Sequence, residues 1–300
     1  MADSTALNTG VVGESRRSRR LRAAIRPWLI PKVAVGVTIV AMLVIAGAFA
    51  PWLAPYDPNG QNLSRVLRPP QWLSGPHVLG TDAVGRDILS RLFYGARISL
   101  VIAIMVVIIS GVVGLILGAV SGYFAKTTDF VIQKFVEVVW AFPPLLLAIA
   151  IMAFLGQGLG NLILALVSQR WIAYCRVSRG QALSLRSREF VEAARSLGAG
   201  HTRIIMRHIL PNCVGPIVVF MTLIIAAAIL IEAALSFLGF GIQPPNAALG
   251  SLIDDGQEQG LETWWLVTFP GLVIVVIALC VNFIGDGLRD ALDPTQRRTR

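Results

Sequence analysis

The chain has 300 residues, of which 55% are hydrophobic and only 14% are charged, and its mean hydropathy is +0.69. Soluble domains carry about 25% charged residues, so this composition excludes an ordinary soluble domain and a disordered chain. The net charge of +9 would suit a nucleic-acid-binding protein, but Lys and Arg also set the orientation of membrane proteins. The positions of the basic residues relative to the apolar runs therefore decide between these classes.

Long runs without charge predict membrane-spanning helices, because a bilayer-spanning helix needs about 20 mostly apolar residues. The run from Val138 to Gln169 is too long for one span, and the turn-forming residues 156–161 divide it. We therefore predict an all-α, polytopic membrane protein. Its six predicted spans are 33–52, 98–122, 133–155, 160–178, 212–235 and 265–286. Within the third span, Pro143 and Pro144 must kink or interrupt the helix.

The predicted organisation follows from these spans. A basic tail (1–32) precedes the first transmembrane helix (33–52), and an extracytoplasmic or interfacial segment (53–97) follows it. A core of five transmembrane helices (98–286) leads to a C-terminal tail (287–300). The second half of 53–97 is expected to lie along the membrane interface as an amphipathic helix.

The basic residues predict the orientation, because Lys and Arg accumulate on the cytoplasmic side. Most of them fall in the N-terminal tail, in residues 176–211 and after residue 286, which places both termini in the cytoplasm. The charged residues of the loop 236–264 are all acidic, so this loop is expected outside the cell membrane. Five arginines of the first outside loop conflict with this rule: Arg65, Arg68, Arg86, Arg91 and Arg97. Positive-inside bias accounts for much of the basicity, so nucleic acid is not an expected partner.

Three features within the predicted spans are candidates for packing or transport. Gly114, Gly118 and Gly122 recur every four residues, which favours close helix packing within the chain over a gate or a subunit interface. Glu232 lies near the outer end of the fifth span, a position that favours a structural role, although the residue could touch substrate in a transport pathway. Arg170 is a charge within the fourth span and should face a partner or extend to the interface.

Motifs for independent catalysis are missing from the sequence. The only lysines are Lys32, Lys126 and Lys134, and none follows a glycine, so the chain has no Walker A loop. The histidines do not form a His-x-x-x-His pair, and the cysteines Cys175, Cys213 and Cys280 are interpreted as packing residues. We predict no catalytic residues, no metal site and no cofactor in this chain.

Residues 178–211 predict a cytoplasmic helical hairpin. Apolar residues at helical spacing predict a first amphipathic helix: Leu183, Leu185, Phe190, Val191, Ala194 and Leu197. Gly198 and Gly200 would end it, a second short helix would carry Ile204, Ile205 and Ile209, and Pro211 would begin the fifth span. A short protruding helix of this kind suits docking into the groove of a partner.

The same segment carries a specific resemblance. Glu192-Ala193-Ala194, followed by Gly198 and Leu210-Pro211, resembles the EAA signature of permease subunits of bacterial ABC importers. Four further stretches are similar to the C-type permeases of dipeptide, oligopeptide and nickel importers: Leu79–Asp87, Ser90–Leu100, Ala234–Pro245 and Gly285–Pro294. The resemblance extends from about residue 22 to residue 294.

The resemblance implies a type I ABC importer permease in the bacterial inner membrane. Such a subunit forms the pathway with a second homologous permease, docks on two ATP-binding cassette subunits that bind ATP and Mg²⁺, and receives substrate from an extracytoplasmic binding protein. The coupling contact with the ATPases would fall at about 194–203, where Gly198 permits a tight turn. The residues implied in coupling are Glu192, Ala193, Ala194, Arg195, Ser196, Leu197, Gly198, Ala199, His201 and Arg203.

Other interpretations stay open from the sequence. The expected cargo is a di- or oligopeptide, with a nickel chelate or another small solute as the alternative. A secondary transporter would need intramembrane ion-coupling residues and inverted repeats, and only Arg170 and Glu232 are candidates for the former. A membrane receptor or scaffold that recruits a partner through the hairpin is a third interpretation.

Overall fold

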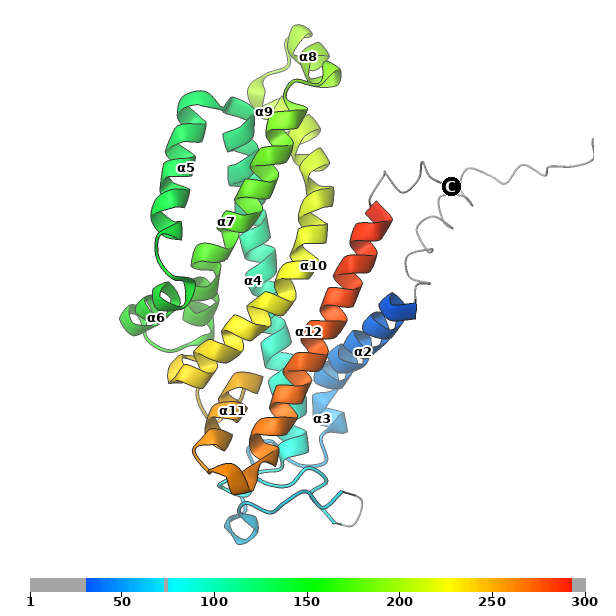
Figure 1. The fold of residues 1–300 in the computed structure, drawn as a ribbon, viewed down its shortest axis with the longest axis vertical. Helices are drawn as coiled ribbons and strands as arrows, with labels where there is room; N and C mark the ends of the chain where they lie inside the picture. The colour runs from blue at the N-terminus through cyan, green and yellow to red at the C-terminus, as the bar shows by residue number, and fades with distance from the viewer. Residues whose placement is uncertain (1–30, 73–74, 293–300) are drawn as a thin grey trace, which may run out of the picture.

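The long apolar runs form helices that lie side by side and extend between the two ends of the molecule (Figure 1). The computed structural model describes residues 31–72 and 75–292. Within these ranges no β-strand occurs, and the only β-type pairing is the isolated bridge between Thr81 and Asp87. The all-α prediction is confirmed. Most of the predicted basic tails, 1–30 and 293–300, lie outside the described residues.

The helix bounds are as follows. The longer helices are α2 (Pro31–Ala48), α4 (Ile88–Phe124), α5 (Lys126–Trp140), α6 (Pro144–Leu155), α7 (Leu159–Leu185), α10 (Leu210–Leu235) and α12 (Trp265–Leu292). The shorter elements are α3 (Ala50–Leu53), η2 (Leu63–Arg65), α8 (Glu189–Ser196), α9 (His201–Ile204), η3 (Ile205–Ile209), η4 (Ser236–Phe240), α11 (Leu249–Gln257) and η5 (Leu261–Thr263). The predicted turn between the third and fourth spans is confirmed at residues 156–158.

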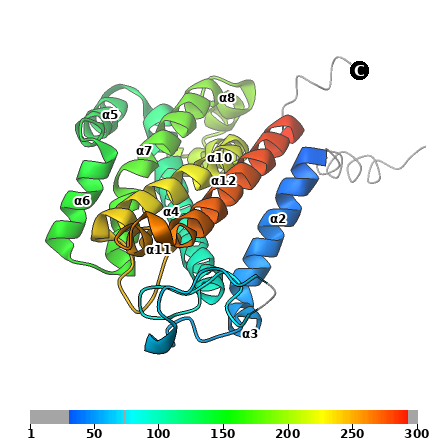
Figure 2. The same ribbon diagram turned by 60° about the horizontal axis from the view of Figure 1, so that its bottom comes forward.

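Three described helical segments are long and apolar enough to cross a membrane: Ile88–Phe124, His201–Phe240 and Trp265–Arg289. The bent pair α5 and α6 is a fourth candidate. The described apolar part of α2, Val33–Ala48, is shorter than a full span, and α7 carries three arginines. The count of six spans therefore stays a prediction. Figures 1 and 2 both place α2 beside α12, with α5 and α6 at the opposite side of the bundle.

The second predicted span begins earlier than the sequence indicated. Helix α4 starts at Ile88 rather than at residue 98, so the predicted interfacial amphipathic helix is wrong: residues 88–97 are the first turns of α4. The Asp87 carboxylate caps this helix by accepting a hydrogen bond of 2.8 Å from the Ser90 N–H. The preceding stretch is mostly irregular and packs at the same end of the molecule as α11 (Figure 1).

The third predicted span is not one helix. Helices α5 and α6 are separated at residues 141–143 and bent by 84°, so the interruption predicted at Pro143 and Pro144 is confirmed, and the predicted span 133–155 consists of two helices. Proline has no N–H to continue the α5 ladder, but it suits the first turn of α6 at Pro144. The side-chain amide of Gln169 in α7 donates to the carbonyls of Val139 (3.1 Å) and Phe142 (2.6 Å). The break is therefore stabilised from a neighbouring helix.

The core is centred on the packing of α4 against α7. Gly114, Gly118 and Gly122 face α7 so closely that a Cβ atom on any of them would clash with its backbone carbonyls. The clashing carbonyls belong, in order, to Trp171, Cys175 and Arg179. The two helices run in the same direction, because both residue series rise together. In this structure the glycines serve contact within the chain.

Candidate functional site

The hairpin end of the molecule is fixed by a small apolar cluster. Val191 of α8 and Ile204 and Ile209 of the following segment are fully buried against Ala119 and Tyr123 of α4. Tyr123 Oη also lies 2.9 Å from His201 Nδ1. The inner side of the hairpin is therefore anchored on the end of α4, and its outer side is exposed.

The helices of the hairpin are divided differently from the prediction. Helix α7 continues to Leu185 and α8 begins only at Glu189, so a single amphipathic helix over residues 183–197 is wrong. The predicted second short helix is not separate either, because His201–Phe240 is one continuous helical segment and Pro211 lies inside it. Leu197, which the pattern counted toward the apolar face, is 87% exposed.

The tip of the hairpin is a glycine-dependent turn. Gly198 has φ of +79°, the left-handed region that L-residues with a Cβ disfavour. Its N–H donates to the carbonyl of Arg195 (3.0 Å), and the N–H of Ala199 donates to the carbonyl of Ala194 (3.0 Å). This pair of hydrogen bonds is the Schellman arrangement that ends α-helices. The chain thus reverses at Gly198 with its backbone groups satisfied.

Most of the residues implied in coupling lie on the outer surface of this tip. Among them Ala194 and Ala199 are half-buried, whereas the others are exposed: Glu192, Ala193, Arg195, Ser196, Leu197, Gly198, His201 and Arg203. The structure brings them together on one protruding turn, at the end where Figure 1 labels α8 and α9. The tip therefore offers a large apolar side chain surrounded by charges of both signs.

At the opposite end, buried ion pairs account for two of the arginines that conflicted with the positive-inside rule. Arg91 is 2% exposed, and its Nη1 lies 2.6 Å from Asp82 Oδ2 and 3.2 Å from Asp255 Oδ2. Arg86 Nε lies 2.6 Å from the same Asp82 oxygen. Because Asp255 lies on α11, these contacts join the irregular segment before α4 to the loop before α12. Sequence reasoning missed both aspartates as partners: Asp82 lies only four residues before Arg86, but no local spacing connects Asp255 to either arginine.

Glu232 is a buried link between helices. Its side chain is fully buried and accepts hydrogen bonds from Ser99 Oγ of α4 (2.9 Å) and Ser236 Oγ (2.8 Å). Ser99 Oγ in turn accepts from the Leu249 N–H of α11 (3.2 Å). Glu232 is not among the residues that line the cavity described next. Ser99 was not singled out from the sequence, because its partner is far along the chain.

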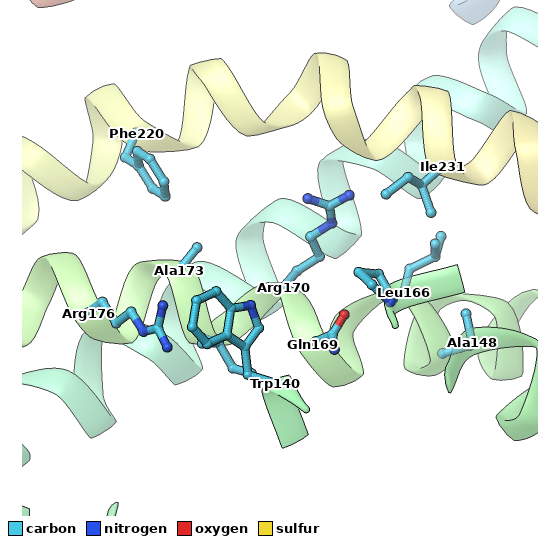
Figure 3. Close-up of a pocket in the computed structure, with 12 residues that line it drawn as sticks. Trp140, Ala148, Leu166, Gln169, Arg170, Ala173, Arg176, Phe220 and Ile231 are labelled. Carbon is cyan, nitrogen blue, oxygen red and sulfur yellow. The ribbon is translucent and has the colours of Figure 1, made fainter. Parts of the chain in front are cut away.

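A cavity of ≈ 340 Å³ lies between the α5–α6 bend, α7 and α10 (Figure 3). Its polar lining comes mainly from α7, with Gln169, Arg170 and Arg176. The Arg176 guanidinium stacks on the Trp140 ring, with 3.6 Å from its carbon to the ring centroid. The remaining lining is apolar: Pro144, Ala148, Ala165, Leu166, Ile172, Ala173, Phe220 and Ile231. No group of side chains suited to a metal ion occurs among the described residues.

The helical bundle, the apolar spans and the exposed hairpin define a membrane permease. The chain belongs to the family of binding-protein-dependent transport system inner membrane components, whose model matches residues 114–298. Residues 32–70 match the N-terminal transmembrane domain of oligopeptide transport permease C. This membership confirms the resemblance seen in the sequence, and the chain is an inner-membrane permease subunit of an ABC importer.

Curated relatives match most of the chain. The di/tripeptide transport system permease protein of Pseudomonas aeruginosa is 42% identical over 262 residues, which is 86% of this chain and 86% of that protein. The dipeptide transport system permease protein of Escherichia coli is 44% identical over 263 residues, 87% of this chain and 88% of that protein. A solved structure of the MetNI methionine ABC transporter covers 65% of this chain and 94% of its own, with a TM-score of 0.50 and 16% identity. That last likeness concerns the fold alone.

Proposed function

We propose that this permease forms, with a second homologous permease, the membrane pathway of an importer for di- or oligopeptides. Two ATP-binding cassette subunits power the importer, and an extracytoplasmic binding protein delivers the peptide. The support is the identity of 40–44% to permeases named for dipeptide or di/tripeptide transport, over most of their length. Nickel chelates and other small solutes are the competing cargo.

The proposed coupling to the ATPase subunits rests on the structure of the hairpin tip. Leu197 is 87% exposed on a turn that the chain itself anchors through Val191 and Ile204. An exposed apolar side chain on a rigid, protruding turn suits a groove on a partner. The tip enters a groove of an ATPase subunit, where Glu192 makes a charged contact. ATP and Mg²⁺ are bound by those subunits, and this chain transmits their closure to its helices.

The orientation follows from the same assignment. The hairpin end is cytoplasmic, which places the end with α11 outside and both chain termini inside, with six spans. Figure 1 supports it, because α8 and α9 lie at one end of the bundle and α11 lies at the other. ATP binding then shifts the two-permease assembly between outward-open and inward-open states, since a ligand shifts an equilibrium by its difference in affinity for the two states.

The test compares two charge reversals on α8. Glu192→Lys is expected to lower peptide uptake at least about tenfold and to weaken retention of the ATPase subunits, because reversing a charge in a docked contact costs several kcal/mol. Glu189→Lys makes the same change on the same exposed helix, outside the tip, and is expected to keep uptake within about twofold of wild type. Both are assayed in the complete transporter in proteoliposomes at matched abundance.

Two outcomes would contradict the proposal. Normal ATP-dependent uptake by the Glu192→Lys complex would exclude the coupling role of the tip. A wild-type complex that transports no peptide but does transport nickel would exclude the peptide cargo while leaving the importer class intact.

A further inference from the structure

Arg170 differs from the other arginines that line or enter the helical bundle. Arg91 is paired with aspartates, Arg179 forms a bidentate pair with Asp129, with both nitrogen–oxygen distances 2.6 Å, and Arg176 stacks on Trp140. Arg170 is half-buried and forms no hydrogen bond or ion pair with any other residue in the described part of the chain. A charge within a membrane segment is costly and is kept for a partner or a function.

The surroundings of Arg170 favour an anion. Figure 3 shows its guanidinium extending from α7 toward α10, across the cavity. The cavity lining contains two arginines and no Asp or Glu. Arginine stays protonated in proteins, so the cavity holds a permanent positive charge. Gln169, the other polar group there, is already engaged with the carbonyls of the α5–α6 break.

A second polar group without a partner lies beside the cavity. The Tyr174 hydroxyl, one helical turn after Arg170, is buried and has no hydrogen-bond partner among the described residues. Its ring packs edge-on against Phe220, which lines the cavity, with 5.4 Å between ring centroids. Buried polar groups are normally satisfied, so an unpaired hydroxyl next to an unpaired guanidinium indicates a site that is completed by something else.

We propose that Arg170 binds the C-terminal carboxylate of the peptide as it passes through the membrane. This inference rests on the proposed peptide cargo. The planar guanidinium matches a carboxylate with two parallel hydrogen bonds, which a point charge such as Lys cannot reproduce. A cavity of ≈ 340 Å³ is within the size range of small-ligand sites. The free carboxylate is the anionic group that every unmodified peptide shares, so one arginine can bind peptides that differ in their side chains.

The experiment measures uptake of a dipeptide and of its C-terminally amidated analogue in proteoliposomes that hold the complete transporter. The ratio of the two uptake rates is compared between variants. Because the same binding protein delivers both peptides to every variant, its own preference cancels in that comparison. Arg170→Gln is expected to lower the ratio about fivefold or more, since a charge-assisted pair is lost. Arg170→Lys keeps the charge without the planar fork and is expected to lower it about two- to threefold.

Arg176→Gln is the matched control, because Arg176 lines the same cavity but is already stacked on Trp140. Its ratio should fall by less than about twofold, because the positive charge of the cavity is reduced but the Arg170 fork is kept. If each Arg170 variant slows uptake of the free and the amidated dipeptide by the same factor, the ratio is unchanged and the inference is overturned. Arg170 would then pair with the second permease or a lipid. If the transporter does not assemble with Arg170→Gln, the test rests on Arg170→Lys alone: a lowered uptake ratio supports the inference, and an unchanged ratio overturns it. Failure of the wild-type complex to transport either peptide would instead refute the proposed cargo.

Discussion

The two ends of the molecule treat their charges in opposite ways. At the end with α11, Arg86 and Arg91 are paired with Asp82 and Asp255 inside the chain. At the hairpin end, Leu197 is exposed and the charged residues around it face outward. Apolar exposure alone does not separate the two ends, because Leu261 at the end with α11 is 97% exposed. The difference lies in the charges: the end with α11 pairs them within the chain, whereas the hairpin end leaves them exposed for the partner that the proposed coupling requires. Substitutions should therefore reduce stability most at the first end and transport most at the second.

The largest loss of stability is expected at Arg91. Arg91→Met should lower the free energy of unfolding in detergent by about 2–3 kcal/mol, because it removes one of the two guanidinium groups that pair with the buried Asp82 carboxylate and leaves only Arg86 there. Arg97→Met removes an exposed arginine from the same helix and should change stability by no more than about 0.5 kcal/mol. Denaturant titration of both purified variants gives the comparison. Equal losses for the two would show that the ion-pair network does not hold this end together.

Arg91 also shows where the sequence stops predicting the fold. The apolar runs located the helices correctly, but charge-free runs end at arginines, so α4 was predicted to begin at residue 98 instead of Ile88. A buried arginine is compatible with a helix only if a carboxylate lies near, and Asp255 is supplied from far along the chain. For the same reason α7 was predicted to end at 178, although Arg179 is paired with Asp129. Long-range pairing of this kind has no local pattern.

An intermediate effect is expected at the contact between α4 and α7, which joins the two ends. Gly118→Val should lower the free energy of unfolding by about 1–3 kcal/mol, because its side chain would overlap the backbone of α7 at Cys175. Gly180→Val is the control, since a Cβ at Gly180 meets nothing within 4 Å. Its stability should be equal to or slightly above wild type, as glycine is a poor helix former. A Gly118→Val variant as stable as wild type would mean that α4 and α7 move apart to admit the valine side chain without a loss of free energy of unfolding.

The candidate site was predictable only in part. The EAA spacing located the hairpin and its glycine turn, because a helix end of this kind depends on local sequence. The exposure of Leu197 was not predictable, since the amphipathic pattern continued through residues 186–188, where the helix breaks. The cavity at Arg170 depends on the 84° bend between α5 and α6. The prolines indicated an interruption there but not the size of the bend.

The smallest loss of stability is expected at the hairpin tip, where the proposed coupling predicts the largest loss of transport. Gly198→Ala should cost about 1 kcal/mol, because φ of +79° strains a residue with a Cβ, even though open space surrounds that position. Gly198→Asn should cost less, since Asn tolerates the left-handed region better, and Gly200→Ala, at φ of −66°, should cost no more than about 0.5 kcal/mol. Thermal unfolding in detergent ranks the three variants. If Gly198→Ala and Gly200→Ala are equally stable, the turn is not conformationally constrained, and a rigid tip cannot be the basis of coupling.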